Sequence, residues 1–84
     1  MKNKILITLY IPSIDSNYEI FIPTNETIKK VVNLVVKSVN DMVDDGLSLS
    51  EEHYFIDPNT FQAYDNASII RDTNIENSKK IILI

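Results

Sequence analysis

The spacing of the apolar residues changes near residue 28, and this change limits the folds that the chain can adopt. Before it, in two separate stretches, apolar residues recur at every second position; after it, they recur at intervals of three and four. A period of two is typical of a strand with one buried face, whereas the longer spacing is typical of an amphipathic helix. The sequence therefore predicts an α+β fold in which two strands precede a long helix.

The two alternating stretches are residues 4–11 (KILITLYI) and 18–23 (YEIFIP). In the first, the odd-numbered residues share one face and the even-numbered residues the other, namely Ile5, Ile7, Leu9 and Ile11 against Leu6, Thr8 and Tyr10. In the second, the two faces carry Tyr18, Ile20 and Ile22 against Glu19 and Phe21. Residues 12–17 are rich in types that favour turns, and Pro23 ends the second stretch, so we predict an antiparallel hairpin.

The helical spacing covers positions 28, 31, 32, 35, 39, 42 and 43. Thr27 precedes this run and is the predicted N-cap, with Asn25 as the alternative. Gly46, the only glycine of the chain, follows the run, where a left-handed residue commonly ends a helix. We expect the helix to end by Met42 or Val43, because acidic residues before the glycine lie unfavourably at the negative end of the helix dipole.

The second half of the chain divides into shorter segments. We predict a strand at 53–56, a tight turn at 57–60, a short strand at 61–64 and a last strand at 79–84. A short turn of helix anchored by Ile70 and Ile75 suits the stretch before the last strand, which has too few apolar residues for a long helix. The predicted order is β-β-α-β-β-β, in a single domain that covers residues 1–84.

Two stretches of sequence carry a resemblance as well as this order. The stretch SIIRDTNIENSKKIILI places an apolar residue, Asp, Asn-Ile and a polar turn ahead of the last strand, with Ile70, Asp72, Asn74, Ile75, Ile81 and Leu83 at the matching positions. The stretch IPTNETIKKVVNLV supplies a strand end, a threonine cap and a helix start. Both resemble the ubiquitin-like superfamily. The resemblance implies a β-grasp fold, a mixed sheet with one long helix packed on one face.

The layout of the whole chain resembles a narrower group. It is short and acidic, its first strand begins almost at Met1, and it stops abruptly in a strand. These features are similar to the stand-alone bacterial domains of the YukD/EsaB type that are associated with type VII secretion. The resemblance implies a cytoplasmic accessory protein of a secretion or signalling assembly.

Composition excludes several classes of partner. The chain has 84 residues, no cysteine and a net charge of −4, with a hydrophobic content of 44%. Without cysteine it has neither disulfides nor a thiolate zinc site, so the apolar core must hold the fold unaided. The acidic balance argues against nucleic acid, which needs a basic surface. No apolar run approaches the length of a membrane span, so we expect no membrane insertion.

The residues that catalysis commonly uses are sparse. His53 is the only histidine, so neither a typical zinc site nor an activated serine is indicated. Two acidic groups, Asp41, Asp44 and Asp45 and then Glu51 and Glu52, do not have the alternating spacing of a calcium loop. One glycine cannot build a glycine-rich phosphate loop. We therefore predict no catalytic residue, no metal site and no cofactor, and we expect that the protein is not an enzyme.

Conjugation is a separate question for this superfamily. Protein modifiers and sulfur carriers of this kind are activated at a C-terminal Gly-Gly, whereas this chain ends Ile-Ile-Leu-Ile. We therefore expect a module that is not conjugated to other proteins. A sulfur carrier or modifier that lacks its Gly-Gly tail here is the alternative.

Alignment on Asn74-Ile75 suggests a binding surface. It places Ile81 and Leu83 against the helix, with Ile5, Ile7 and Leu9 beside them, and leaves an apolar patch on the open face of the sheet: Leu6, Thr8, Tyr10, Ile82 and Ile84. We predict that this patch binds a partner protein, because a contiguous apolar patch is unusual on a small acidic monomer. The strand preference of these residue types is the alternative reading. Phe21 and Phe55 belong either to the patch or to the core. A second hypothesis is a homo-oligomer that forms through the patch or through the open edge of the second strand.

Overall fold

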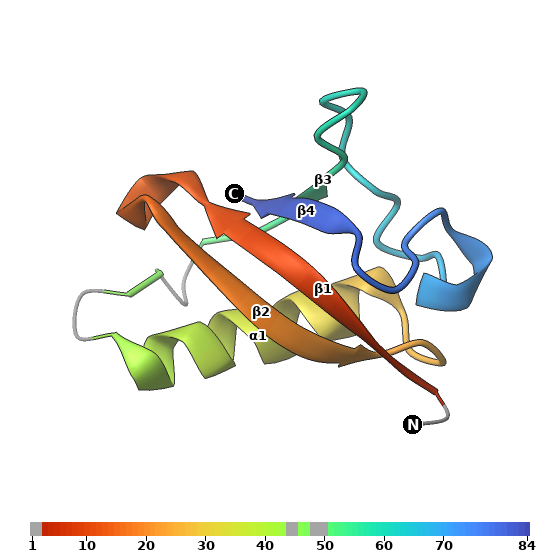
Figure 1. Ribbon diagram of the computed structural model, residues 1–84, viewed down its shortest axis with the longest axis horizontal. Helices are drawn as coiled ribbons and strands as arrows, with labels where there is room; N and C mark the ends of the chain where they lie inside the picture. Colours follow the sequence, from red (N-terminus) through yellow and green to blue (C-terminus); the bar gives the residue numbers. More distant parts are fainter. Residues whose placement is uncertain (1–2, 44–45, 48–50) are drawn as a thin grey trace.

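In the computed structural model, which describes residues 3–43, 46–47 and 51–84, four strands form one sheet and a single α-helix packs against it (Figure 1). The elements follow in the order β1 (Lys4–Ile11), η1 (Pro12–Ile14), β2 (Ser16–Pro23), α1 (Ile28–Met42), β3 (Phe55–Ile56), η2 (Ile70–Asp72) and β4 (Lys80–Leu83). The sheet order is β2-β1-β4-β3. β1 is antiparallel to β2 and parallel to β4, so the first and last strands lie side by side at the centre. The predicted mixed sheet with one long helix is confirmed.

The hairpin closes earlier than the sequence predicted. β1 has the predicted bounds, but β2 begins at Ser16, two residues before the predicted start, and pairs there with Ile11. The connection is short because residues 12–14 form a single 3₁₀ turn and Asp15 adopts a left-handed conformation with φ of 47°. Aspartate tolerates this conformation better than most residues, and it redirects the chain at once into β2.

The helix has the predicted bounds and the predicted N-cap. Thr27 Oγ1 accepts a hydrogen bond from the backbone N–H of Lys30 at 3.3 Å, which decides the N-cap in favour of Thr27 over Asn25. Valine has a low intrinsic helix propensity, but five valines of α1 are buried against the sheet: Val31, Val32, Val35, Val36 and Val39. Tertiary burial therefore outweighs local preference in this helix.

Gly46 does not have the role that the sequence predicted. No glycine adopts a positive φ in the part of the chain that the structure describes, and Val43 at the helix end is extended. Instead, the Asn40 side chain binds the backbone of Leu47: Nδ2 donates to the carbonyl at 2.7 Å, and Oδ1 accepts from the N–H at 2.5 Å. A Cβ atom on Gly46 would lie 2.0 Å from Asn40 Oδ1, so glycine is required by the close approach of a side chain. The neighbouring Asp44 and Asp45 lie outside the described residues.

The second half of the chain has less strand than predicted. β3 covers only Phe55–Ile56, and residues 61–64 form no strand; a single bridge joins Ile56 to Ala63. Phe61 interrupts the extended run because its φ is 58°. The last strand is confined to Lys80–Leu83. The short helical turn is confirmed at residues 70–72, and its two predicted anchors, Ile70 and Ile75, are both buried.

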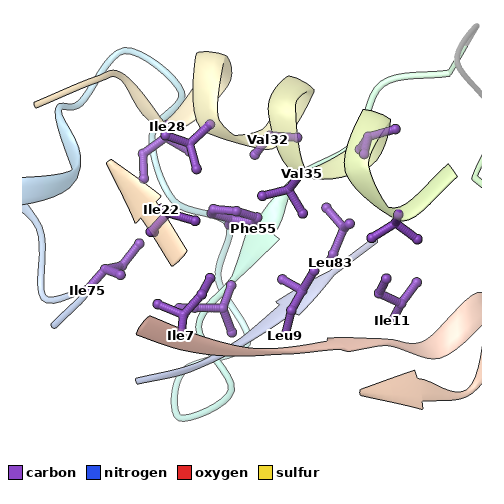
Figure 2. Packing of buried hydrophobic residues seen from close by; sticks show 14 of the residues in the cluster. Ile7, Leu9, Ile11, Ile22, Ile28, Val32, Val35, Phe55, Ile75 and Leu83 are labelled. Atoms are coloured by element: carbon purple, nitrogen blue, oxygen red, sulfur yellow. The ribbon is translucent and has the colours of Figure 1, made fainter. Parts of the chain in front are cut away.

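The core lies between the sheet and α1. Figure 2 shows Ile7, Leu9 and Ile11 of β1 pointing toward the helix, and Val32 and Val35 of α1 belong to the same buried cluster. Ile81 and Leu83 of β4 are fully buried in the same cluster, as predicted, whereas Ile5 is only partly buried at its margin. Because residues alternate along each strand, this packing fixes which side chains lie on the opposite, open face of the sheet.

Candidate protein-binding surface

The open face of the sheet is the side that points away from α1. Leu6, Thr8 and Tyr10 of β1 lie on it, between the buried odd-numbered residues, and each is half-buried. In the parallel pairing, Tyr10 is the partner of Ile82, which is also half-buried. Neighbouring residues in register point to the same side of a sheet, so the structure brings four of the five predicted patch residues onto one face.

Ile84, the fifth predicted residue, lies at the end of this face. It follows β4 and exchanges two backbone hydrogen bonds with Tyr54, at 2.8 and 3.1 Å. Its side chain is 55% exposed and lines an open hollow of about 500 Å³, together with Ile14 and Leu47. Ile84 therefore borders a hollow at the end of the sheet that lies next to the β1–β2 connection.

The structure decides between the alternatives for the two phenylalanines. Phe21 is the antiparallel partner of Leu6 and is 55% exposed, so it lies on the open face. Phe55 is fully buried in the core (Figure 2). The sequence could not settle this point, because a shift of one residue in strand register exchanges the two faces.

A polar row divides the apolar residues of the open face. Glu19, Thr8 and Lys80 are partners across β2, β1 and β4, and both charged residues are exposed. On one side of this row lie Leu6 and Phe21; on the other lies a row formed by Tyr10, Ile82 and Ile56. In register, the face therefore carries two apolar groups on either side of a polar row, and the predicted patch residue Thr8 lies in that row.

The row Tyr10–Ile82–Ile56 is well fixed in place. The Tyr10 hydroxyl donates a hydrogen bond to Asp15 Oδ1 at 3.0 Å, and this contact raises the pKa of Tyr10. Ile82 lies between Tyr10 of β1 and Ile56 of β3 in the sheet, and Ile56 is only 8% exposed. The row thus offers an aromatic ring whose hydroxyl is held in a fixed direction beside aliphatic side chains.

A buried carboxylate anchors the loop beside β3 and was not predicted as a functional residue. Asp57 is 6% exposed; its Oδ1 accepts the backbone N–H of Asn59 at 2.9 Å, and its Oδ2 accepts Asn74 Nδ2 at 3.0 Å. Lys79 Nζ lies 3.6 Å from Oδ1. The hydrogen bond from Asn59, then that from Asn74 and the charge of Lys79, lower the pKa of Asp57 although burial opposes this. The only signal in the sequence was the predicted turn at 57–60.

The same network holds Tyr64. Its hydroxyl donates to Asn74 Oδ1 at 2.6 Å, and burial followed by the nearby charge of Asp57 raises the pKa of Tyr64 to about 12. Because Asn74 and Lys79 both precede β4, the network ties residues 57–64 to the start of the last strand. It therefore supports the region where β3 and β4 present Ile56 and Ile82.

Within residues 3–43, 46–47 and 51–84, no three side chains of His, Cys, Asp or Glu lie close enough together to hold a metal ion. In the same ranges, no helix has both the length and the apolar character needed to cross a membrane. His53 lies beside Glu51 and Glu52 at the hollow that Ile84 borders.

Comparison with known proteins identifies the fold. Neither a protein-family model nor a curated protein matches the sequence. The N-terminal ubiquitin-like domain of the 4931431F19Rik protein aligns with a TM-score of 0.75 and 12% identity, over 100% of this chain and 76% of that one. A chain of the toluene 4 monooxygenase HD complex with 4-bromobenzoate aligns with a TM-score of 0.74 and 9% identity, over 95% of each chain.

A chain of the MycP5-free ESX-5 inner membrane complex aligns with a TM-score of 0.72 and 3% identity, over 98% of this chain and 21% of that one. Identities this low are evidence for the fold alone. The protein has the ubiquitin-like β-grasp fold that the sequence predicted.

Proposed function

We propose that this protein is a non-catalytic ubiquitin-like module that binds a partner protein through the open face of its sheet. The observation that carries the proposal is the row Tyr10–Ile82–Ile56, in which a fixed tyrosine lies beside aliphatic side chains on the side away from the helix. Tyrosine is enriched at the centres of protein interfaces because it offers a large apolar area together with a hydroxyl group.

The surroundings of the row favour a protein over other partners. Phe21 and Ile84 are each more than half exposed at the two ends of the face, so a partner would remove a substantial apolar area from water. The polar row of Glu19 and Lys80 between the apolar groups supplies charges of both signs, which fit the mixed character of protein interfaces. A net charge of −4 remains unfavourable for nucleic acid.

The proposal that the module is non-catalytic rests on the residues of this chain, because the fold alone does not exclude catalysis. One structural neighbour belongs to a monooxygenase complex, so this fold occurs beside catalysis as well as in ubiquitin-like domains. The residues whose pKa is shifted have structural partners. Asp57 accepts hydrogen bonds from Asn59 and Asn74, and the Tyr10 hydroxyl donates one to Asp15. Groups with such partners are typical of packing and of loop anchoring.

The test is a double substitution on the row. Tyr10→Ala with Ile82→Ser should leave the far-ultraviolet circular dichroism spectrum unchanged and abolish capture of the partner in a pull-down from the source cell. Asn33→Ala, on the exposed side of α1, is the matched control and should capture the partner as the wild type does. Undiminished capture by the folded double variant would exclude the open face as the binding site.

The setting that we propose is a cytoplasmic accessory role in a type VII-like secretion assembly. It is supported by the resemblance of layout to YukD/EsaB-type proteins, and by the occurrence of the fold in a chain of the ESX-5 inner membrane complex. A secretion ATPase and small helical secreted proteins encoded beside this gene are the expected finding. Co-purification of that ATPase with the wild type, but not with the double variant, tests the role directly.

The remaining alternative is a sulfur carrier or protein modifier, and it makes a separate prediction. It requires a Gly-Gly extension after Ile84, whose backbone is held by Tyr54 in this structure. The intact mass of the protein isolated from its source cell shows whether the Gly-Gly extension is present. A mass that includes the extension supports the carrier, and a mass without it supports the interaction module.

A further inference from the structure

The outer edge of β2 is an open strand edge in the part of the chain that the structure describes. β2 stands at the end of the sheet order, and its other side pairs with β1. The N–H of Thr8 donates to Lys79 O at 3.0 Å, so even-numbered residues of β1 direct their backbone groups away from β2. Their partners Asn17, Glu19 and Phe21 consequently direct their own N–H and C=O groups outward, along the edge.

This edge carries few of the features that keep strand edges from pairing. Proteins commonly protect an edge with lysine, with proline, with a bulge or with a covering segment. β2 pairs with β1 without a bulge over its whole length; its one proline is the terminal Pro23, and its one charged residue is Glu19. The opposite edge of the sheet is protected, because the chain folds back along β3 and Tyr64 N–H donates to Phe55 O at 2.9 Å.

Apolar side chains also gather beside β2. Among the described residues, three of the five large hydrophobic side chains that are exposed are Phe21 of β2 and Leu34 and Met42 of α1. Val36 lines a hollow with His53 on the β3 side of the helix. Leu34, two positions before it, lies on the far side, and Met42 lies two turns farther along the same side as Leu34. The open edge is therefore flanked by an apolar stripe.

We propose that β2 pairs antiparallel with β2 of a second copy of this chain, so that the two sheets become continuous across a two-fold axis. In such an isologous pairing, each copy offers the same surface to the other. The outward N–H and C=O groups of Glu19 and Phe21 pair with those of the other edge, and the stripe of Leu34 and Met42 meets the corresponding stripe of the second copy. A second copy of the chain offers both a complementary strand edge and a matching apolar stripe. The inference does not rest on the open face described above.

Charge and overlap select the register of this pairing. With Glu19 opposite Glu19, two like charges would be direct neighbours, which destabilises a strand pair. A shift that places Glu19 opposite Phe21 removes this contact and pairs residues 17–23, whereas the shift that places it opposite Asn17 pairs only residues 16–20. The favoured register sets the axis beside Ile20, so the two Ile20 residues form a pair without hydrogen bonds, with Cα atoms about 4.5 Å apart.

The first experiment uses the unmodified protein. Sedimentation equilibrium should show a monomer–dimer equilibrium, and amide hydrogen exchange should slow at Glu19 and Phe21 as the protein concentration rises. The amides of Tyr18 and Ile20 are internal controls, because they face β1 in both states. A monomer at the highest concentration, or exchange at Glu19 and Phe21 that does not depend on concentration, would overturn the proposal.

Two substitutions test the geometry. Leu34→Glu should raise the dissociation constant of the dimer roughly tenfold or more, because it places a charge among apolar side chains at an interface. Asn33→Glu adds the same charge on the other side of α1 and should leave the constant unchanged. If the dimer persists and the two variants change its dissociation constant equally, the interface lies elsewhere and the proposal is contradicted.

The chain has no cysteine, so a single cysteine reports directly on proximity. Ile20→Cys should form a disulfide-linked dimer under mild oxidation, since the expected Cα separation lies within the range of disulfides. Ala67→Cys, in an exposed loop, is the control for random collision. Rapid cross-linking of Ile20→Cys alone supports the two-fold axis at Ile20, and equal rates for both variants refute it. Neither outcome depends on whether the open face captures a partner.

Discussion

Tyr10 and Ile82 are partners in neighbouring parallel strands at the centre of the sheet, and both point away from the helix. Their neighbours in sequence, Leu9 and Ile81, are also partners and are fully buried beneath the same strands. One strand pair thus builds the core with one set of residues and the candidate binding surface with the other. Substitutions on the two sides should therefore have different consequences.

The first prediction compares adjacent residues of β4. Ile81→Ala should lower the free energy of unfolding by about 2–5 kcal/mol, because it leaves a cavity in a packed core. Ile82→Ala should lower it by less, since that side chain is already partly exposed to solvent and no closed cavity forms. Urea denaturation measures both values. Equal losses for the two variants would show that Ile82 belongs to the core.

The second prediction concerns Asn40 and Gly46. Gly46→Ala should destabilise the protein by about 1–3 kcal/mol, because the new Cβ would collide with Asn40 Oδ1 and displace the side chain that binds Leu47. In an Asn40→Ala background the collision is absent, so the same glycine substitution should cost much less. A double-mutant cycle by thermal denaturation measures the coupling. Additive effects of the two substitutions would contradict the proposed clash.

The strongest periodic patterns of the sequence predicted the largest part of the fold. β1 and α1 have their predicted bounds because their apolar residues follow periods of two and of three to four. Each of these periods places the apolar residues on one face of its element, where they are buried together. The opposite faces of Ile81 and Ile82 followed from the same alternation. Patterns of this kind depend only on residues that are near in sequence.

The errors arise where the pattern of apolar residues does not specify the backbone conformation or the side-chain contact. Asp15 and Phe61 adopt positive φ values, which shorten the first connection and abolish the strand predicted at 61–64. Gly46 is required by the side chain of Asn40, and nothing in the local sequence indicates that contact. For the candidate surface, alternation placed Tyr10 and Ile82 on the open face, but the polar row through Thr8 depends on cross-strand register, which a single stretch of sequence does not specify.

The third prediction concerns the start of the helix. Thr27→Ala should reduce stability by about 1 kcal/mol, because it removes the hydroxyl that accepts the N–H of Lys30. Asn25→Ala serves as the control, since Asn25 is exposed and was the alternative N-cap. Thermal denaturation at neutral pH separates the two. A larger loss for Asn25→Ala would transfer the capping role to Asn25.

The fourth prediction is a dependence of stability on pH that originates at Asp57. Its pKa is lower in the folded protein than the ordinary value of 3.8, because Asn59, Asn74 and Lys79 favour the charged form. A group with a lowered folded pKa stabilises the protein above its unfolded pKa, and that contribution is lost as the pH falls through the folded value. Urea denaturation should therefore show stability falling below about pH 4 in the wild type. Asp57→Asn should lower stability at neutral pH and flatten this acid decline, whereas Asp72→Asn, an exposed control, should leave both nearly unchanged. An acid decline of the same size in Asp57→Asn would mean that other carboxylates cause it.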